Sequence, residues 1–157
     1  SNQYLSLLFF FLLVLIPNFN DPYYKIENIT PILRDISNSV NNENTFILPM
    51  DEQRHPFEYY SSNLFGSIET TDKKGCTYLM PDIQNYSIFL PDSQERWDKI
   101  YSTLKKSNPS ELYLIGIELD GTIGMIRDAE NYLLEAGFKK VSENNYDIGM
   151  LLIKYTK

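Results

Sequence analysis

An uninterrupted apolar segment near the start of the sequence is the feature that most limits how this chain can fold. Residues Tyr4 to Ile16 read YLSLLFFFLLVLI, and among these 13 residues only Ser6 interrupts the apolar run, which Pro17 and Asn18 close. A helix of this length would be about 20 Å long, whereas the hydrocarbon core of a bilayer is about 30 Å thick. The segment is therefore too short to cross a membrane by itself.

Three interpretations of this segment compete. A secretory signal peptide would have a basic leader and small residues near a cleavage site, and the sequence around Ser1 to Ile16 has neither. A buried core helix or strand is the second interpretation, although Phe9 to Leu13 leave no polar face of the kind that surface helices have. The third, which we favour, is the last part of a transmembrane helix that begins upstream. We expect residues 1–17 to be such a helix end or an apolar anchor, and residues 18–157 to form a single α/β domain.

The residues that follow the apolar segment indicate on which side of a membrane the domain would lie. No Lys or Arg occurs after Pro17 until Lys25. Cytoplasmic flanks of membrane helices are usually enriched in basic residues. Phe19, Tyr23 and Tyr24 fit an interfacial aromatic belt, and they would serve equally well as ordinary core or surface aromatics. The sequence thus predicts a location at the cell membrane, with the domain on the extracytoplasmic side.

Charge and composition argue against several classes of partner. The chain has 14 Lys and Arg against 21 Asp and Glu, so its formal net charge is 14 − 21 = −7. Such a surface repels phosphate backbones, and we therefore predict no nucleic-acid partner. The single cysteine, Cys76, cannot form an internal disulfide. With one His and one Cys, and without the ligand spacing of a metal motif, the sequence predicts no metal site and no cofactor.

Helical and strand-like patterns alternate along residues 30–157. The run Glu111–Leu119 is too apolar for a half-exposed strand and predicts a central strand covered on both faces. The predicted helices are Thr30–Val40, a short one at Phe57–Tyr60, one with Trp97, Ile100, Tyr101 and Leu104 on one face, and Met125–Ala136, after which Gly137 is expected in a left-handed cap. The predicted strands are Thr45–Leu48, one around Thr77–Leu79, Ser87–Leu90, Glu111–Leu119, Phe138–Val141 and Asp147–Tyr155, the last two joined by a turn at Glu143–Asn145.

This order of elements predicts an α/β fold. Strands that alternate with helices are typical of a layered, Rossmann-like sheet with right-handed crossovers. We therefore expect a mostly parallel sheet with helices on both faces. The two closing strands predict an antiparallel hairpin at the C-terminal edge of that sheet.

The densest group of ionisable side chains lies in the polar loop that follows the predicted strand Thr45–Leu48. Open α/β sheets place ligands at the carboxyl ends of their strands. Histidine is a common general acid or base, and a carboxylate such as Asp51 or Glu52 could orient His55 for such chemistry, although a loop of this kind is more often simply solvated. The candidate ligand contacts are Asp51, Arg54, His55, Tyr59 and Tyr60, and no residue is assigned as catalytic or as a metal ligand.

Other motifs are weaker. Asp120–Gly124 places two glycines between a predicted strand and a predicted helix, but it lacks the GxGxxG spacing of a dinucleotide loop. No GxSxG motif occurs, and Cys76 has no His nearby in sequence to activate it. These motifs therefore do not predict a nucleotide site or a nucleophilic enzyme.

Taken in order, the features above resemble the C-terminal soluble portion of polytopic membrane glycosyltransferases of the GT-C type. That group includes bacterial relatives of protein mannosyltransferases and of aminoarabinose transferases. The resemblance covers nearly the whole chain, through motifs that are individually generic. The matching features are the apolar end Leu5–Ile16, the helix Thr30–Val40, the strand Thr45–Leu48, the aromatic pair in Phe57–Tyr60, the strand Glu111–Leu119 and the LLEAGF run Leu133–Phe138.

The resemblance implies a polyprenyl-phosphate sugar donor and transfer on the non-cytoplasmic face of the membrane. In that family the catalytic carboxylate lies in a loop near the start of the membrane part, for which this sequence has no counterpart. The implied role is accessory: covering the membrane site, or contacting the acceptor or donor. Two other hypotheses stay open, namely a membrane-tethered binding or interaction module and a soluble small-molecule enzyme with its site at Asp51–His55.

Overall fold

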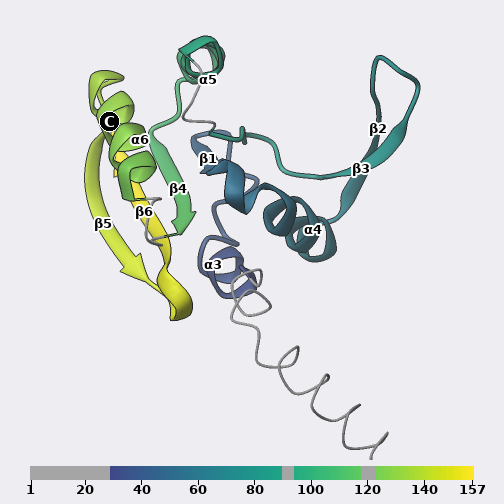
Figure 1. The fold of residues 1–157 in the computed structure, drawn as a ribbon, viewed down its shortest axis with the longest axis horizontal. Helices are drawn as coiled ribbons and strands as arrows, with labels where there is room; N and C mark the ends of the chain where they lie inside the picture. Colours follow the sequence, from purple (N-terminus) through teal and green to yellow (C-terminus); the bar gives the residue numbers. More distant parts are fainter. Residues whose placement is uncertain (1–28, 90–93, 118–122) are drawn as a thin grey trace, which may run out of the picture.

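A computed structural model describes residues 29–89, 94–117 and 123–157 of the chain. The fold is mixed α/β, with a four-stranded sheet in the order β1-β4-β6-β5 and a separate two-stranded sheet, β2-β3 (Figure 1). The predicted anchor, residues 1–17, lies outside the described residues, as do residues 18–28. In order, the elements are α3 (Thr30–Asp35), β1 (Thr45–Pro49), the 3-10 helix η1 (Asp51–Gln53), α4 (Arg54–Phe65), β2 (Ser67–Thr71), β3 (Thr77–Pro81), α5 (Gln94–Ser107), β4 (Glu111–Ile117), α6 (Ile123–Glu135), β5 (Lys139–Asn145), the 3-10 helix η2 (Asp147–Gly149) and β6 (Met150–Thr156).

The prediction of a mostly parallel sheet is wrong. Among the four described strands of the main sheet, only β1 and β4 pair in parallel, while β6 pairs antiparallel with both β4 and β5. The reason lies in the last two strands: β6 is buried along most of its length, whereas every residue of β5 is exposed. The apolar strand therefore takes the interior place beside β4, and the polar strand takes the edge. An antiparallel C-terminal hairpin does form that edge, as expected.

An extended segment also runs parallel to β1 on the side away from β4. The backbone N–H of Ile47 donates to the carbonyl of Asn85 at 2.9 Å, and the N–H of Ser87 donates to the carbonyl of Ile47 at 3.1 Å. Parallel bridges join Ile47 to Tyr86 and Met50 to Phe89. The predicted strand Ser87–Leu90 is thus in an extended conformation as far as Phe89. Leu90 lies outside the described residues.

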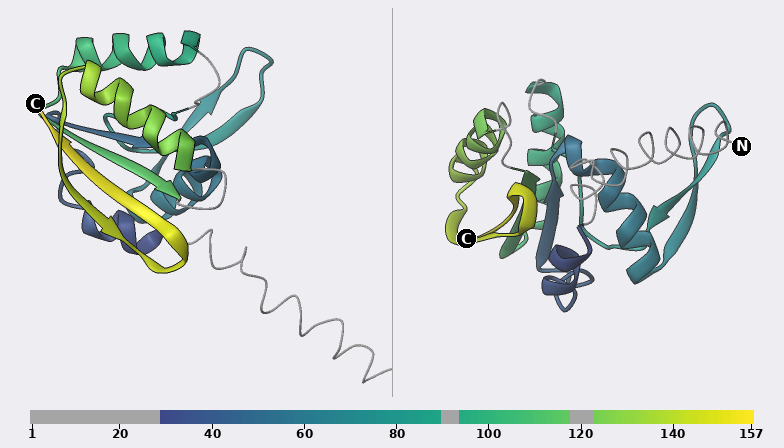
Figure 2. Two further views of the ribbon diagram at one scale, coloured as in Figure 1. Left: turned by 60° about the vertical axis from the view of Figure 1, so that its left-hand side comes forward. Right: turned by 60° about the horizontal axis from the view of Figure 1, so that its bottom comes forward.

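Helices pack against both faces of the four-stranded sheet. Alternate residues of a strand point to opposite faces. Phe46 and Leu48 of β1 accordingly belong to the core that includes buried residues of α5 and α6, while Ile47 belongs to the core that includes residues of α3 and α4. Figure 2 shows α5 and α6 together on one side of the sheet and α3 on the other.

The predicted helices are present, with different ends. The first is shorter than expected: α3 stops at Asp35, and turns follow up to Asn41, although Ile36 and Val40 are still buried. The second is longer, because α4 continues to Phe65. Ala129 and Leu133 of α6 are buried.

Glycines account for two of the chain reversals. Gly137 has φ +89°, as the predicted left-handed cap after α6 requires. The prediction of a turn at Glu143–Asn145 is wrong, because those residues belong to β5. The chain reverses instead through Tyr146 and η2. There the positive φ of +72° belongs to Gly149, which adopts that conformation without a Cβ clash.

Residues 67–81 form a hairpin where only one strand, near Thr77–Leu79, was predicted. β2 and β3 pair antiparallel, and the side chain of Asp72 closes the turn between them by accepting backbone N–H bonds from Lys74 at 2.8 Å and Cys76 at 2.9 Å. The β2 sequence SIETT lacks the apolar alternation that identifies a half-buried strand, and the strand is in fact largely exposed. Among the residues described, no helix combines the length and apolar character needed to cross a bilayer.

Candidate functional site

The polar loop singled out from the sequence lies at the carboxyl end of the parallel pair β1 and β4. β1 ends at Pro49, and the chain continues through Met50 into η1 and then α4. The N–H of Met50 donates to the carbonyl of Ile115 in β4 at 2.8 Å, and the N–H of Gln53 donates to the carbonyl of Met50 at 2.8 Å. These bonds hold η1 against β4 and so fix the direction in which α4 begins.

Gly116 of β4 allows this close approach. A Cβ built at Gly116 would lie 2.9 Å from Sδ of Met50, which is buried. A larger residue at that position would force the thioether of Met50 to move aside. The side chain of Gln53 is buried. Among the described residues, its Oε1 has no hydrogen-bond partner.

The predicted charged residues do not converge on one point. Asp51, Glu52, Arg54 and His55 are all exposed. Nε of Arg54 pairs with Oε1 of Glu58 one helical turn later, at 3.2 Å. Within the described residues, no hydrogen bond or ion pair is recorded for the side chain of Asp51 or His55. The carboxylate–histidine pair that acid/base chemistry at this loop would use is therefore not assembled in the structure.

The two tyrosines of α4 differ in their surroundings. Their rings meet edge to face, with centroids 5.1 Å apart and planes at 82°. Tyr60 is partly buried against the core below α4, whereas Tyr59 is 66% exposed. Of this pair, Tyr59 is the one that can contact another molecule without disturbing the fold.

We expect Asp51→Ala and His55→Ala each to change the free energy of unfolding by no more than about 0.5 kcal/mol, because exposed side chains without recorded partners contribute little to stability. Urea unfolding of the full chain in a mild non-ionic detergent measures this. A loss of several times that size in either variant would show that the loop has a structural role.

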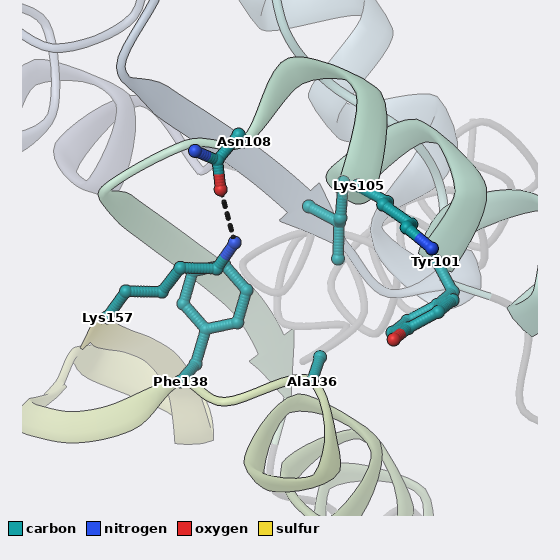
Figure 3. A pocket seen from close by; sticks show the side chains of 7 residues that line it. Tyr101, Lys105, Asn108, Ala136, Phe138 and Lys157 are labelled. Carbon is teal, nitrogen blue, oxygen red and sulfur yellow. Dashed lines mark hydrogen bonds between the residues drawn. The ribbon is translucent and has the colours of Figure 1, made fainter.

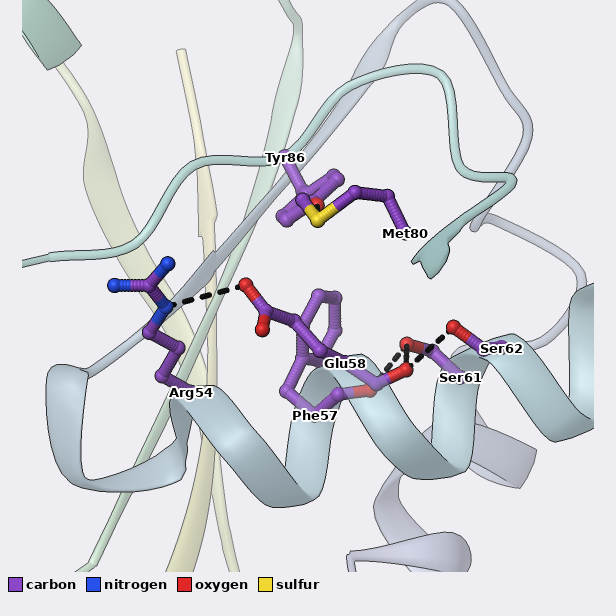
Figure 4. A network of polar contacts seen from close by, with 7 residues as sticks. All are labelled: Arg54, Phe57, Glu58, Ser61, Ser62, Met80 and Tyr86. Atoms are coloured by element: carbon purple, nitrogen blue, oxygen red, sulfur yellow. Dashed lines mark hydrogen bonds and ion pairs between the residues drawn. The ribbon is translucent and has the colours of Figure 1, made fainter. Parts of the chain in front are cut away.

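A polar network that the sequence did not reveal lies beside these residues (Figure 4). The ring of Tyr86 lies against the buried ring of Phe57, with centroids 5.3 Å apart, and its hydroxyl reaches Sδ of Met80 at 3.8 Å. Burial, followed by the nearby carboxylate of Glu58, raises the pKa of Tyr86 to about 12. The i, i+4 spacing of Arg54 and Glu58 was a readable signal, but nothing in the sequence linked Tyr86 to α4.

The raised pKa of Tyr86 predicts a loss of stability in alkali. The unfolded chain releases the phenolic proton at the ordinary pKa of 10.0, whereas the folded chain holds it until about pH 12. The stabilisation is therefore complete below pH 10 and declines as the pH rises from 10 to 12. We expect Tyr86→Phe to flatten this part of the curve of unfolding free energy against pH. The control is Tyr59→Phe, and an equal flattening by both variants would contradict the assignment to Tyr86.

A small cavity lies elsewhere, between the C-terminal ends of α5 and α6 (Figure 3). Its volume is about 120 Å³, below the roughly 300–1,000 Å³ of small-molecule pockets. Nζ of Lys157 donates to Oδ1 of Asn108 at 2.8 Å and lies 5.1 Å from the ring centroid of Phe138. None of the candidate residues of the polar loop lines this cavity. Its lining consists of Tyr101, Leu104, Lys105, Asn108, Ala136, Phe138 and Lys157.

The described residues thus present the polar loop as an open, solvent-facing surface. Three or more His, Cys, Asp or Glu side chains placed to hold a metal ion do not occur among them. Within the glycine-containing segment Asp120–Gly124, residues Asp120, Gly121 and Thr122 lie outside the described residues. No protein-family model matches this chain, and no curated protein and no solved structure shows significant similarity to it.

Proposed function

We propose that this chain is a non-catalytic, extracytoplasmic domain of a membrane glycosyltransferase that uses a polyprenyl-phosphate sugar donor. Its role is accessory, in handling the acceptor or the donor. The observation that carries the proposal is the apolar run Tyr4–Ile16, because it gives the folded domain a membrane attachment. Without that run, the features of the chain would fit a soluble α/β protein equally well.

The short connection between the apolar run and the domain supports a role for the domain close to a membrane surface. Ile29 is fully buried in the core, so the compact part of the domain begins there at the latest. Residues 17–28 separate it from Ile16, and a chain of 12 residues can span at most roughly 40 Å. The distance from any part of the domain to the attachment point therefore cannot exceed the length of this connection plus the diameter of the domain.

The exposed residues at the start of α4 supply the contacts that the proposal needs. Arg54 and His55 offer hydrogen-bond donors, and Tyr59 combines a donor with an apolar ring that a sugar face can cover. No carboxylate is recorded as a partner of His55 among the described residues, which favours a binding role over acid/base catalysis at this surface.

Sugar transfer by the full-length protein tests the proposal. Membranes from cells that express the gene are supplied with a polyprenyl-phosphate sugar, and transfer is followed at varied acceptor concentration. Loss of one hydrogen bond is worth about 1 kcal/mol, so His55→Ala and Tyr59→Ala are each expected to raise KM for the acceptor about fivefold with kcat retained. Lys105→Ala with Lys106→Ala, two exposed changes on α5, is the matched control. Absence of any transfer by the parent protein would refute the glycosyltransferase assignment, and unchanged KM would refute the contacts.

A membrane-tethered interaction module is the second candidate. The apolar side chains exposed on the β2–β3 hairpin favour it, because exposed apolar groups often mark interaction surfaces. The upstream coding sequence separates the hypotheses. Many further apolar spans favour the glycosyltransferase, a single span favours the tethered module, and none favours a soluble enzyme with its site at Asp51–His55.

A further inference from the structure

We propose that the β2–β3 hairpin dips into the headgroup region of a lipid bilayer that contains anionic lipids. The inference rests on the proposed membrane attachment and adds a second contact to it. The hairpin extends away from the rest of the fold beyond α4 (Figure 1). Its 15 residues, 67–81, include three of the eight large hydrophobic side chains that are exposed in the described part of the chain.

The exposed apolar groups occupy both faces of the hairpin. Ile68 and Tyr78 are 51% and 44% exposed and share one face, because the register pairs Ile68 with Met80 and Thr70 with Tyr78. Leu79 is 61% exposed and points to the opposite face. Lipid surrounds an inserted ribbon and can therefore cover apolar groups on both of its faces. Tyrosine at the water boundary and aliphatic residues beside it are also typical of membrane interfaces.

The charge of the hairpin suits an anionic surface better than the rest of the chain does. Two lysines, Lys73 and Lys74, balance Glu69 and Asp72, so residues 67–81 contribute none of the net charge of −7. Asp72 turns its carboxylate into the turn, where it accepts the two backbone N–H bonds described above. The charges that extend from the tip are therefore the two ammonium groups, which anionic headgroups attract.

Ile29, the first described residue, lies on the same side of the main sheet as α4, the helix that the hairpin follows. Ile29, where the described chain begins, and Phe57 of α4 belong to the same core cluster, opposite the one that includes α5 and α6. The hairpin follows α4 directly through Gly66 and contacts it through β3. A membrane attached through the N-terminal segment can thus reach the hairpin without contacting α5 or α6.

The lone cysteine gives a direct test. Cys76 is exposed and lies between the turn and β3, so an environment-sensitive fluorophore on it reports where the hairpin tip is. The full chain is reconstituted in vesicles of phosphatidylcholine with one quarter phosphatidylglycerol, and some of the lipids carry a nitroxide quencher in the acyl chain. We expect strong quenching of the Cys76 label. The label control is Cys76→Ser with Ser102→Cys, which places the dye on the exposed side of α5 and is expected to give little quenching.

Two pairs of variants assign the effect to the residues named. Ile68→Ser with Leu79→Ser is expected to lower the inserted fraction roughly tenfold, since two apolar side chains lose their gain from leaving water. Leu134→Ser with Val141→Ser, also exposed and outside the hairpin, is the matched control and should change nothing. Lys73→Gln with Lys74→Gln should lower insertion about fivefold per lysine, and only with anionic lipid. Lys105→Gln with Lys106→Gln is the control for that pair.

Separate outcomes overturn separate proposals. If the chain floats with the vesicles but the Cys76 label is not quenched, the hairpin proposal is wrong and the membrane attachment stands. If the chain does not float with the vesicles at all, the proposed attachment fails as well. A shift in the emission of the label that appears without lipid and grows with protein concentration would instead identify a second copy of the chain as the occupant.

Discussion

Replacing Leu114 with alanine is expected to lower the free energy of unfolding by about 3 kcal/mol. Leu114 is fully buried in β4, between Leu48 of β1 and Ile153 of β6, and all three belong to the core that includes α5 and α6. Neighbours on both sides hold the cavity open after truncation, so little of the loss is recovered by relaxation.

A matched control is available on α6. Leu134 is 54% exposed, and Leu134→Ala is expected to cost no more than about 0.5 kcal/mol. Urea unfolding of both variants, in the same detergent as the parent, gives the comparison. Equal losses from the two substitutions would mean that β4 is not the covered central strand of the sheet.

Replacing Phe57 with alanine is expected to cost about 4 kcal/mol, within the range for truncating a buried aromatic ring. Phe57 is fully buried, packs against Tyr86 and holds α4 against the sheet. Because α4 carries Arg54, His55 and Tyr59, the same change should also disturb the candidate contact surface.

Tyr59→Ala on the same helix is the control for Phe57→Ala. Its ring is largely exposed, so its removal should affect unfolding little while leaving α4 in place. Thermal unfolding followed by circular dichroism distinguishes the two variants. A Phe57→Ala variant as stable as Tyr59→Ala would show that α4 does not depend on this anchor.

The sequence predicted the elements more reliably than their arrangement. Glu111–Leu119 identified β4 because a strand covered on both faces is apolar along its whole length. Strand order was not predictable in the same way. The prediction of a mostly parallel sheet failed at the last two strands, because the polar residues of β5 suit an edge and β6 lies between β4 and β5.

Two further differences between prediction and structure have local explanations. The asparagines at 144 and 145 could have formed a turn, but their polarity serves equally well in an exposed edge strand, and Gly149 supplies the positive φ instead. In the β2–β3 hairpin, one strand near Thr77–Leu79 was predicted and β2 was missed, because the apolar residues there are exposed and so follow no burial pattern.

The candidate site was predictable in position and not in organisation. A polar loop after a buried strand indicated where Asp51–His55 would lie, and the structure places it at the carboxyl end of β1 beside β4. The neighbours of α4 were not predictable, because Met80 and Tyr86 reach it through the hairpin and the extended segment that follows. Contacts between segments far apart in sequence leave no local pattern to read.

Labelling of a thiol on α5 in intact cells tests the central claim, that the domain lies at a membrane on its extracytoplasmic side. Ser102 is exposed on α5, away from the hairpin, so Ser102→Cys combined with Cys76→Ser places the thiol in water whether or not the hairpin is inserted. A membrane-impermeant maleimide is applied to cells that express this variant of the full-length gene, after which the peptide containing position 102 is examined by mass spectrometry. We predict that the thiol at position 102 is modified without permeabilisation. Modification only after the cells are lysed would place the domain on the cytoplasmic side and contradict the account.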